Sequence, residues 1–317
     1  MSDPEFSVDP RIDLPDGIEL RPATPADYDG VVAFTRDTWE ERSDYLPDVY
    51  HEWIERDAED NGQLTLLADA GDAVAGLAQI VMLSPYEAWA QGMRVNPSFR
   101  GRGVGTAITE ALFAWARERG AVVARNLVFS WNQAGLGQSR AIGFEPVTEF
   151  RWLHPEPEPV DAGVPEAVTD HVEAGWSYWT ASETRTQLAG LAFDMDETWA
   201  MRELTRETLR RAAEETALFV VTDGGTRALA YRTRTVEREN DDGEAETVAE
   251  YGVGAWADLD AAETLLEAIA VDATRCGATR TRVLIPETAR TVSDGAYLRA
   301  EPSGQPEFVL AADLTGW

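Results

Sequence analysis

Residues 93–106 read MRVNPSFRGRGVGT, and this stretch decides the fold. It follows a strand expected at about Trp89–Val95 and leads into a helix over Val104–Arg119, whose apolar residues recur every three or four positions. Glycines at 101, 103 and 105 let consecutive backbone amides approach an anion, and two arginines flank the first glycine. The first turn of the helix adds unpaired N–H groups and the positive end of its dipole. The stretch therefore predicts a site for a pyrophosphate group.

The elements around this loop predict the fold class. Apolar runs at Leu64–Ala68 and Ala73–Leu83 enclose a short polar turn, which is typical of a β-hairpin. Beyond the helix, Val122–Phe129 predicts a buried strand, and Gln133–Ile142 predicts a short helix before Gly143. The order of hairpin, strand, helix, strand and helix predicts an α/β fold, of the α+β kind with a mixed sheet.

The second half of the chain repeats this order. Its elements are a hairpin, a strand and a helix, expected at 218–222 with 228–236, at 248–256 and at 261–275. Three landmarks recur at a nearly constant offset: Gly120 and Gly277 are 157 residues apart, Pro146 and Pro302 156, and Asp69 and Asp223 154. This agreement favours two copies of one fold over a chance likeness between two mixed domains.

A proline-rich stretch beginning at His154-Pro155-Glu156-Pro157 cannot hold a helix or a central strand. We therefore expect an N-terminal extension at 1–17, a first domain at 18–153, a linker at 154–170 and a second domain at 171–317. In the second domain we expect one helix over Glu197–Glu215. Its solvated face would carry Glu–Arg pairs formed by Arg202, Arg206, Arg210 and Arg211.

Composition excludes several classes of protein. Acidic residues outnumber basic ones 57 to 27 in 317 residues, and a net charge of −30 argues against nucleic acid as a partner. All 27 basic residues are arginines, which excludes mechanisms that need a lysine, such as a Schiff base or a Walker-A loop. One cysteine, Cys276, and three scattered histidines supply neither a disulfide framework nor a usual zinc spacing, so no metal is expected.

The acidic charge without lysine is typical of a halophilic protein, because concentrated salt screens the repulsion. Attraction of a polycationic substrate is the alternative. The N-terminus MSDPEFSVDPRIDLPDG lacks a charged and then apolar signal region, and no run of about 18 apolar residues follows. These features predict a soluble cytoplasmic protein with no membrane partner.

The segment Val95–Gly105 resembles the acyl-CoA loop of the GNAT superfamily of N-acetyltransferases, in which a strand and a proline precede Arg-Gly-x-Gly-x-Gly and a helix. The order of elements over 18–153, with Asn132 after the fifth strand and Gly143-Phe144 after the next helix, also fits that family. A nucleotide-dependent oxidoreductase that binds NAD is a weaker alternative, because the glycines do not follow the Gly-x-Gly-x-x-Gly spacing.

The resemblance implies how acyl-CoA would be held as a cosubstrate. Backbone groups of Met93 and Val95 would pair with the pantetheine arm and polarise the thioester carbonyl, and Asn132 would contact the arm. The pyrophosphate would lie on the amides of Arg100, Gly101, Arg102, Gly103, Val104, Gly105 and Thr106. An amine would then attack the thioester directly, without an acyl-enzyme.

Proton transfer is the step that the resemblance leaves open. Ser139 stands where many relatives carry a tyrosine that protonates the leaving thiolate, so Ser139, water or another group serves, or the thiolate leaves unaided. Glu87 shares strand parity with Met93 and is the candidate base, with ordinary surface charge as the alternative. The acceptor pocket would be walled by Tyr28, Trp39, Glu40 and Tyr45, unless these are ordinary core residues.

The second half lacks the loop. Its counterpart, residues 256–261, reads WADLDA, without glycine or arginine and with two aspartates that would repel a pyrophosphate. We therefore expect a degenerate second copy with a structural role.

The sequence as a whole predicts an N-acetyltransferase that passes an acetyl or other short acyl group to a primary amine of a small molecule or peptide. A monomer with paired domains and a homodimer both fit, and a non-catalytic CoA-binding or regulatory module is the alternative function.

Overall fold

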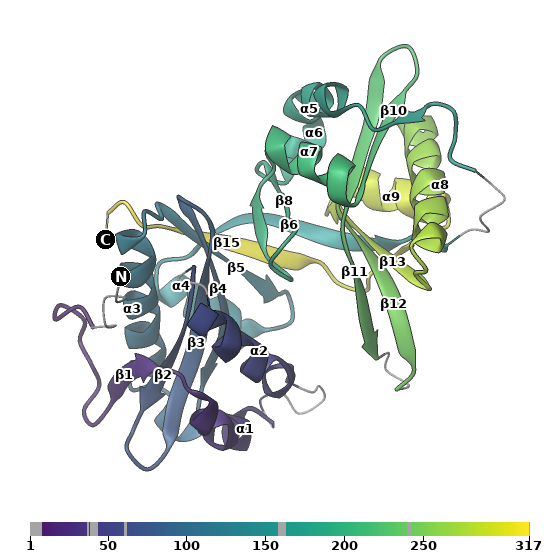
Figure 1. Cartoon of the computed structure of the whole chain (residues 1–317). Coiled ribbons are helices and arrows are strands. Elements are labelled where there is room, and N and C mark those ends of the chain that lie inside the picture. The colour runs from purple at the N-terminus through teal and green to yellow at the C-terminus, as the bar shows by residue number, and fades with distance from the viewer. Residues whose placement is uncertain are drawn as a thin grey trace. The chain divides into compact units, whose positions relative to one another are not determined.

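The computed structural model describes residues 8–36, 38, 44–59, 62–157, 163–239 and 243–316. The chain forms two compact units (Figure 1). The first unit contains Met1–Asn126, Gln133–Glu145 and Leu310–Trp317, and the second contains Leu127–Asn132 and Pro146–Val309. The units are interleaved in sequence, whereas the expected domains were contiguous and met at the proline-rich stretch. The strand expected to close the first domain, β6 (Glu145–His154), lies almost wholly in the second unit.

The strands of the first unit follow the order β1-β2-β3-β4-β5. Neighbours from β1 to β4 are antiparallel, and β5 is parallel to β4. The bounds are Glu19–Pro22 for β1, Gln63–Asp69 for β2, Val74–Ser84 for β3, Glu87–Val95 for β4 and Val123–Phe129 for β5. The β4–β5 ladder runs from Glu87↔Val123 only to Trp89↔Arg125, although both strands continue beyond these residues. The two strands therefore part at this point.

The helices of the first unit cover both faces of its sheet (Figure 1). Helices α1 (Tyr28–Thr35) and α2 (Leu46–Glu59) bury one face, where Leu77 of β3 packs with Trp53. Helix α3 (Val104–Glu118) covers the opposite face. Gly76, which directly precedes Leu77 on β3, faces that side, and a Cβ at Gly76 would meet side chains of α3. The remaining elements are two short 3-10 helices, at Pro25–Asp27 and Pro97–Phe99, and helix α4 at Gln133–Ala141.

Apart from a short two-stranded sheet within residues 191–203, the second unit repeats the element order and the pairing of the first. Strands β7, β10, β11 and β12 are antiparallel neighbours, and β13 is parallel to β12. Helix α8 connects β12 to β13 as α3 connects β4 to β5. The strand bounds are Val168–Thr169 for β7, Ala217–Thr222 for β10, Thr226–Glu239 for β11, Ala245–Trp256 for β12 and Arg280–Pro286 for β13. The helices are α5 at Val172–Ala181, α6 at Glu183–Gln187, α7 at Arg206–Glu215, α8 at Leu259–Arg275 and α9 at Ala289–Tyr297. The shared order is what the constant offset predicts.

The last strands are exchanged between the two units. Strand β6 is antiparallel to β13 in the second unit, through pairs such as Leu284↔Trp152, and the short β14 (Glu301–Pro302) pairs with its other end. Strand β15 (Glu307–Asp313) lies next to β5, and its residues from Leu310 onward belong to the first unit. Just beyond it, the Leu314 amide donates to the Val122 carbonyl at 2.9 Å.

Most of the predicted elements are confirmed, including the mixed α/β fold, both hairpins and helices α3, α4 and α8. The helix expected over Glu197–Glu215 is wrong in nearly its first half. There the short strand β9 (Met201–Glu203) pairs with β8 (Leu191–Phe193), and α7 starts only at Arg206. The Thr205 side chain accepts a hydrogen bond from the Thr208 amide, so it caps α7 and prevents an earlier start. Strand β7 also lies inside the expected linker.

Candidate functional site

The glycine-rich loop joins β4 to α3 through backbone conformations that favour glycine. Gly101 has φ +73° and Gly103 has φ +86°, in the left-handed region that side chains disfavour. The loop is anchored at its start, because the Asn96 side chain accepts from the Ser98 amide and donates to the Val74 carbonyl, both at 3.0 Å. An exposed turn with a fixed entry thus leads into the helix.

The N-terminus of α3 is not capped by a side chain. Its N-cap residue is Gly103, and both Gly103 and Thr106 are exposed. The first N–H groups of a helix have no partner within the helix, and they attract anions when no side chain satisfies them. The first turn of α3 can therefore bind an external anion.

Two arginines add positive charge to this loop. Arg100 and Arg102 are exposed, and among the described residues neither has a carboxylate within 4.0 Å. Arg100 Nε donates to the Val95 carbonyl at 3.3 Å, and the Arg102 guanidinium lies 5.1 Å from the centre of the Phe99 ring. In a chain of net charge −30, such unpaired cations favour an anionic ligand.

The third glycine of the loop has a different role. A Cβ at Gly105 would lie 2.3 Å from Gln138 Nε2, so the absence of a side chain at Gly105 leaves room for the Gln138 side chain of α4 against α3. Gln138 Nε2 is itself buried without a hydrogen-bond partner. The sequence predicted Gly105 as an anion ligand, and its packing role was not visible there because Gln138 is remote in sequence.

The β4 residues expected to hold a ligand arm lie beside the loop. The Met93 carbonyl accepts from Arg94 Nη1 at 3.0 Å, and Arg94 Nε forms an ion pair with the buried carboxylate of Asp44 at 2.7 Å. The carbonyl of Val95, two residues further, is the acceptor for Arg100. Both carbonyls are therefore already engaged by arginine side chains of this chain.

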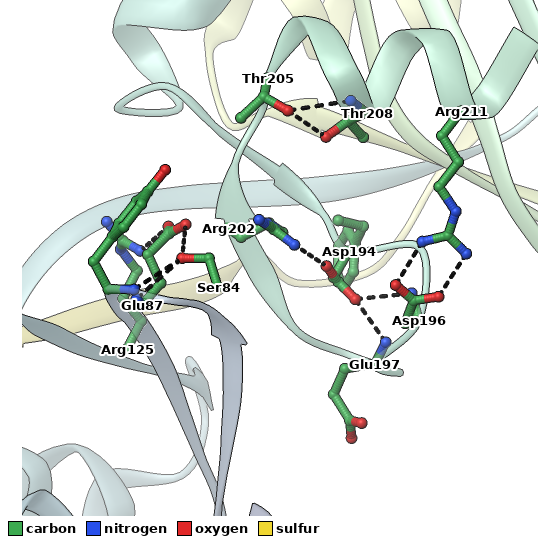
Figure 2. A network of polar contacts seen from close by, with 12 residues as sticks. Ser84, Glu87, Arg125, Asp194, Asp196, Glu197, Arg202, Thr205, Thr208 and Arg211 are labelled. Carbon is green, nitrogen blue, oxygen red and sulfur yellow. Dashed lines mark hydrogen bonds and ion pairs between the residues drawn. The ribbon is translucent and has the colours of Figure 1, made fainter. Parts of the chain in front are cut away.

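Glu87 is a buried, ion-paired carboxylate and not surface charge. Glu87 is only 1% exposed. Its Oε1 accepts a hydrogen bond from Arg125 Nη1 at 2.6 Å, and its Oε2 accepts one from Ser84 Oγ at 3.0 Å (Figure 2). The Ser84 hydroxyl also accepts from the Glu87 amide at 3.1 Å, because both residues belong to the turn between β3 and β4. Glu87 thus sits at the start of the parallel ladder, and the sequence did not identify Arg125 as its partner.

Ser139 lies on α4 and points toward β5. It is 6% exposed, and its Oγ accepts from Asn126 Nδ2 at 3.0 Å. Asn126 is the first residue of β5 beyond the last pair with β4. Sequence reasoning missed Asn126, and the available signal was a polar residue in an otherwise apolar strand.

The predicted acceptor-pocket residues are only partly described. Tyr28 stacks on His51 with ring centres 4.5 Å apart, whereas the Tyr45 ring lies 5.4 Å from the Arg94 guanidinium. Trp39 and Glu40 lie outside the described residues. Asn132 follows β5 closely, and its amide donates to the Phe129 carbonyl at 2.9 Å. Their predicted roles in binding stay predictions.

The corresponding position of the second unit is closed. Helix α8 has Asp258 as its N-cap, and the Asp258 side chain accepts from the Ala261 amide at 3.0 Å. Arg227 also forms an ion pair with Asp258. A carboxylate of the chain thus occupies the place where an external anion would bind.

Comparisons with known proteins agree with this geometry. Residues 28–144 match the family model described as acetyltransferase (GNAT) family. A GCN5-related N-acetyltransferase from Sphaerobacter thermophilus has a TM-score of 0.59 at 18% identity, over 95% of this chain and 97% of that one. A candidate acetyltransferase from Thermoplasma acidophilum gives 0.54 at 15% identity, over 93% and 99%. Another from Pyrococcus horikoshii gives 0.52 at 17%, over 94% and 90%. No curated protein matched the sequence.

The matched segment contains the glycine-rich loop, α3, β5 and α4, so the part of the chain that forms the candidate site is the part that matches the GNAT model. The solved structures match nearly the whole chain and therefore extend the shared fold to the second half. Among the described residues there is no helix long and apolar enough to cross a membrane, and no cluster of potential metal ligands.

Proposed function

We propose that the protein is an N-acetyltransferase that transfers an acetyl or other short acyl group from acyl-CoA to a primary amine. The observation that carries the proposal is the open N-terminus of α3, where an exposed glycine-rich turn and two unpaired arginines meet. A pyrophosphate fits this site because the backbone N–H groups are free of a side-chain cap and no acidic residue in the described part of the chain pairs with the arginines. Residues 28–144, which match the GNAT model, support acyl-CoA over NAD as the ligand.

The residues of the first unit have distinct tasks in this proposal. The loop from Arg100 to Thr106 holds the pyrophosphate, and the parting of β4 and β5 receives the arm that carries the thioester. The amine nitrogen attacks the acyl carbon directly, so the protein contributes position, polarisation of the carbonyl and proton transfer. Glu87 is the candidate proton acceptor, through water, because the buried carboxylate lies at the ladder where the two strands still pair.

The second unit has a structural role in the proposal. It has the element order of the first, so we propose that it is a second copy of the same fold. Asp258 prevents it from binding a second pyrophosphate. The chain would then be a tandem form with one active copy, acting on a small amine or a peptide amine in the cytoplasm.

Titration calorimetry with acetyl-CoA and with NAD tests the ligand. We expect acetyl-CoA to bind with one site per chain and NAD not to bind. A panel of primary amines, assayed for release of free thiol, then tests turnover. Tight binding of NAD without binding of acetyl-CoA would contradict the proposal.

A non-catalytic CoA-binding module is the second candidate, because the hydroxyl of Ser139 is too weak an acid to protonate a thiolate. Binding of acetyl-CoA without turnover on any amine of the panel would favour this candidate.

A further inference from the structure

Three polar side chains lie between the end of the β4–β5 ladder and the start of α3. Asn126 lies on β5 just beyond the last pair of the ladder. Gln138 and Ser139 are neighbours on α4, and the helix directs the first against Gly105 of α3 and the second against Asn126. Helix α4 thus links the start of α3 to the free part of β5.

The hydrogen bonds of this group are incomplete. Asn126 Oδ1 and Gln138 Nε2 are both buried without a partner. Ser139 Oγ accepts from Asn126 Nδ2, and the described residues include no acceptor for the Ser139 hydroxyl hydrogen. An unpaired buried polar group costs about 1–3 kcal/mol, so groups of this kind call for a partner such as a water or a ligand, or for a catalytic role.

We propose that Asn126 is a positioning residue that orients the Ser139 hydroxyl toward the sulfur of the bound thioester. This inference rests on the proposed function. Because Asn126 donates to one lone pair of Oγ, the hydroxyl hydrogen points away from the amide and is available for a second acceptor. The departing thiolate is that acceptor.

Ser139 stabilises the thiolate by a hydrogen bond and keeps its proton. An alkyl thiol has a pKa of about 8.5 and an aliphatic hydroxyl is a far weaker acid, so a proton would not move from oxygen to sulfur. The amine nitrogen forms the bond to the acyl carbon, the C–S bond breaks, and its electron pair stays on sulfur. The proton of the new ammonium passes to a base or to water, and the thiolate takes a proton from solvent after it leaves.

The first test measures the thiol of bound CoA and needs no turnover. The thiolate absorbs in the near ultraviolet, so a pH titration of the CoA complex gives the pKa of the bound thiol. We expect this pKa to lie about one unit lower in the natural protein than in Asn126→Ala or Ser139→Ala, which corresponds to a tenfold preference for the thiolate. Ser139→Thr keeps the hydroxyl and should keep the lowered pKa.

The second test is a double-variant cycle on kcat for acetyl transfer. We expect Asn126→Ala and Ser139→Ala each to lower kcat about tenfold with little change in the Kd of acetyl-CoA. The double variant should be no slower than the slower single variant, because Asn126 acts through Ser139. Losses that multiply to about a hundredfold would overturn the positioning role.

The matched control is Ser293→Ala. Ser293 lies on α9, the counterpart of α4, and its hydroxyl donates to the Ala289 carbonyl of the same helix. It should leave the thiol pKa and kcat unchanged. An unchanged thiol pKa in Asn126→Ala, in a protein that binds CoA and turns over, would overturn this inference and leave the proposed function intact. Failure to bind CoA at all would instead contradict the proposed function.

Discussion

Helices α3 and α8 occupy the same place in the two halves, between an antiparallel strand and the parallel strand that follows it, but their N-termini differ. Gly103 begins α3 without a side-chain cap, whereas Asp258 caps α8 with its own carboxylate and pairs with Arg227. The shared fold supplies the helix dipole in both cases. The two halves therefore differ in whether a carboxylate of the chain already occupies the N-terminus of this helix.

The two halves are alike at the parallel ladder. Arg125 on β5 forms an ion pair with Glu87 on β4, and Arg282 on β13 forms one with Glu250 on β12. Both arginines are the third residue of their strand, and both pairs are buried. A feature that both halves keep is one that the fold itself requires, so the ion pair alone does not distinguish the half with the open cap.

The largest expected effect comes from making the first cap like the second. Gly103→Asp places a carboxylate at the N-terminus of α3, where it would cap the helix and repel a pyrophosphate. We expect the Kd of acetyl-CoA to rise by at least about a hundredfold, measured by calorimetry, while the far-ultraviolet circular dichroism stays unchanged.

Gly103→Asn is the matched control, since asparagine has the same shape, tolerates the left-handed backbone and carries no charge. Gly103→Asn should raise the Kd of acetyl-CoA much less than Gly103→Asp does. Unchanged affinity in Gly103→Asp would move the ligand away from this loop.

The next prediction distinguishes the role of the Glu87 ion pair from that of the Glu250 ion pair. Glu87→Gln removes the carboxylate that pairs with Arg125, and Glu250→Gln removes the one that pairs with both Arg282 and Arg234, so each should lower the free energy of unfolding by about 3 kcal/mol or more. Only Glu87→Gln should also lower kcat, by about tenfold or more, and flatten the acidic limb of the pH–rate profile. Natural turnover and pH dependence in Glu87→Gln would eliminate Glu87 as the proton acceptor.

A smaller effect is specific to the second unit. Burial raises the pKa of Glu307 to about 7 from the 4.5 of a free side chain, while the nearby Arg282 opposes this rise. The folded protein then holds a proton that the unfolded chain loses above pH 4.5, so this group's contribution to stability is full below pH 4.5 and is lost as the pH rises through 7. Glu307→Gln should reduce the fall in unfolding free energy between pH 4.5 and 8 by about 3 kcal/mol. Denaturant unfolding across that range measures it, and an unchanged slope would contradict the raised pKa.

The smallest effect concerns the closed cap. Asp258→Ala removes the bond to the Ala261 amide and the pair with Arg227, and should lower the free energy of unfolding by about 1 kcal/mol. The Kd of acetyl-CoA should not change. A second binding site in this variant would show that the cap alone had kept the second half from binding.

Local patterns in the sequence predicted the parts of this molecule that local forces determine. The loop from Arg100 to Gly105 was identified because glycine spacing and the start of a helix are adjacent in the chain, and both hairpins were identified by their turns. The start of α7 was missed because apolar residues such as Leu204 continue upstream of the helix. The true N-cap, Thr205, lies inside the stretch that was predicted as one helix.

The remaining features depend on residues that are distant in sequence. Arg125 with Glu87, Asn126 with Ser139 and Gln138 against Gly105 each join two different elements. The exchange of β6 and β15 likewise follows from which strand edges meet, and a strand's own residues do not specify that choice.

The exchange of the last strands has a consequence for how the chain is made. A ribosome releases β1 to β5 well before the strand that lies next to β5 in the first unit, because that strand comes from Leu310–Asp313, on the far side of the second unit in sequence. Until then the outer edge of β5 is an unpaired strand, open to pairing with another chain. The half that carries the candidate site is thus completed only after nearly the whole of the other half has been made, and its folding during synthesis must wait for that.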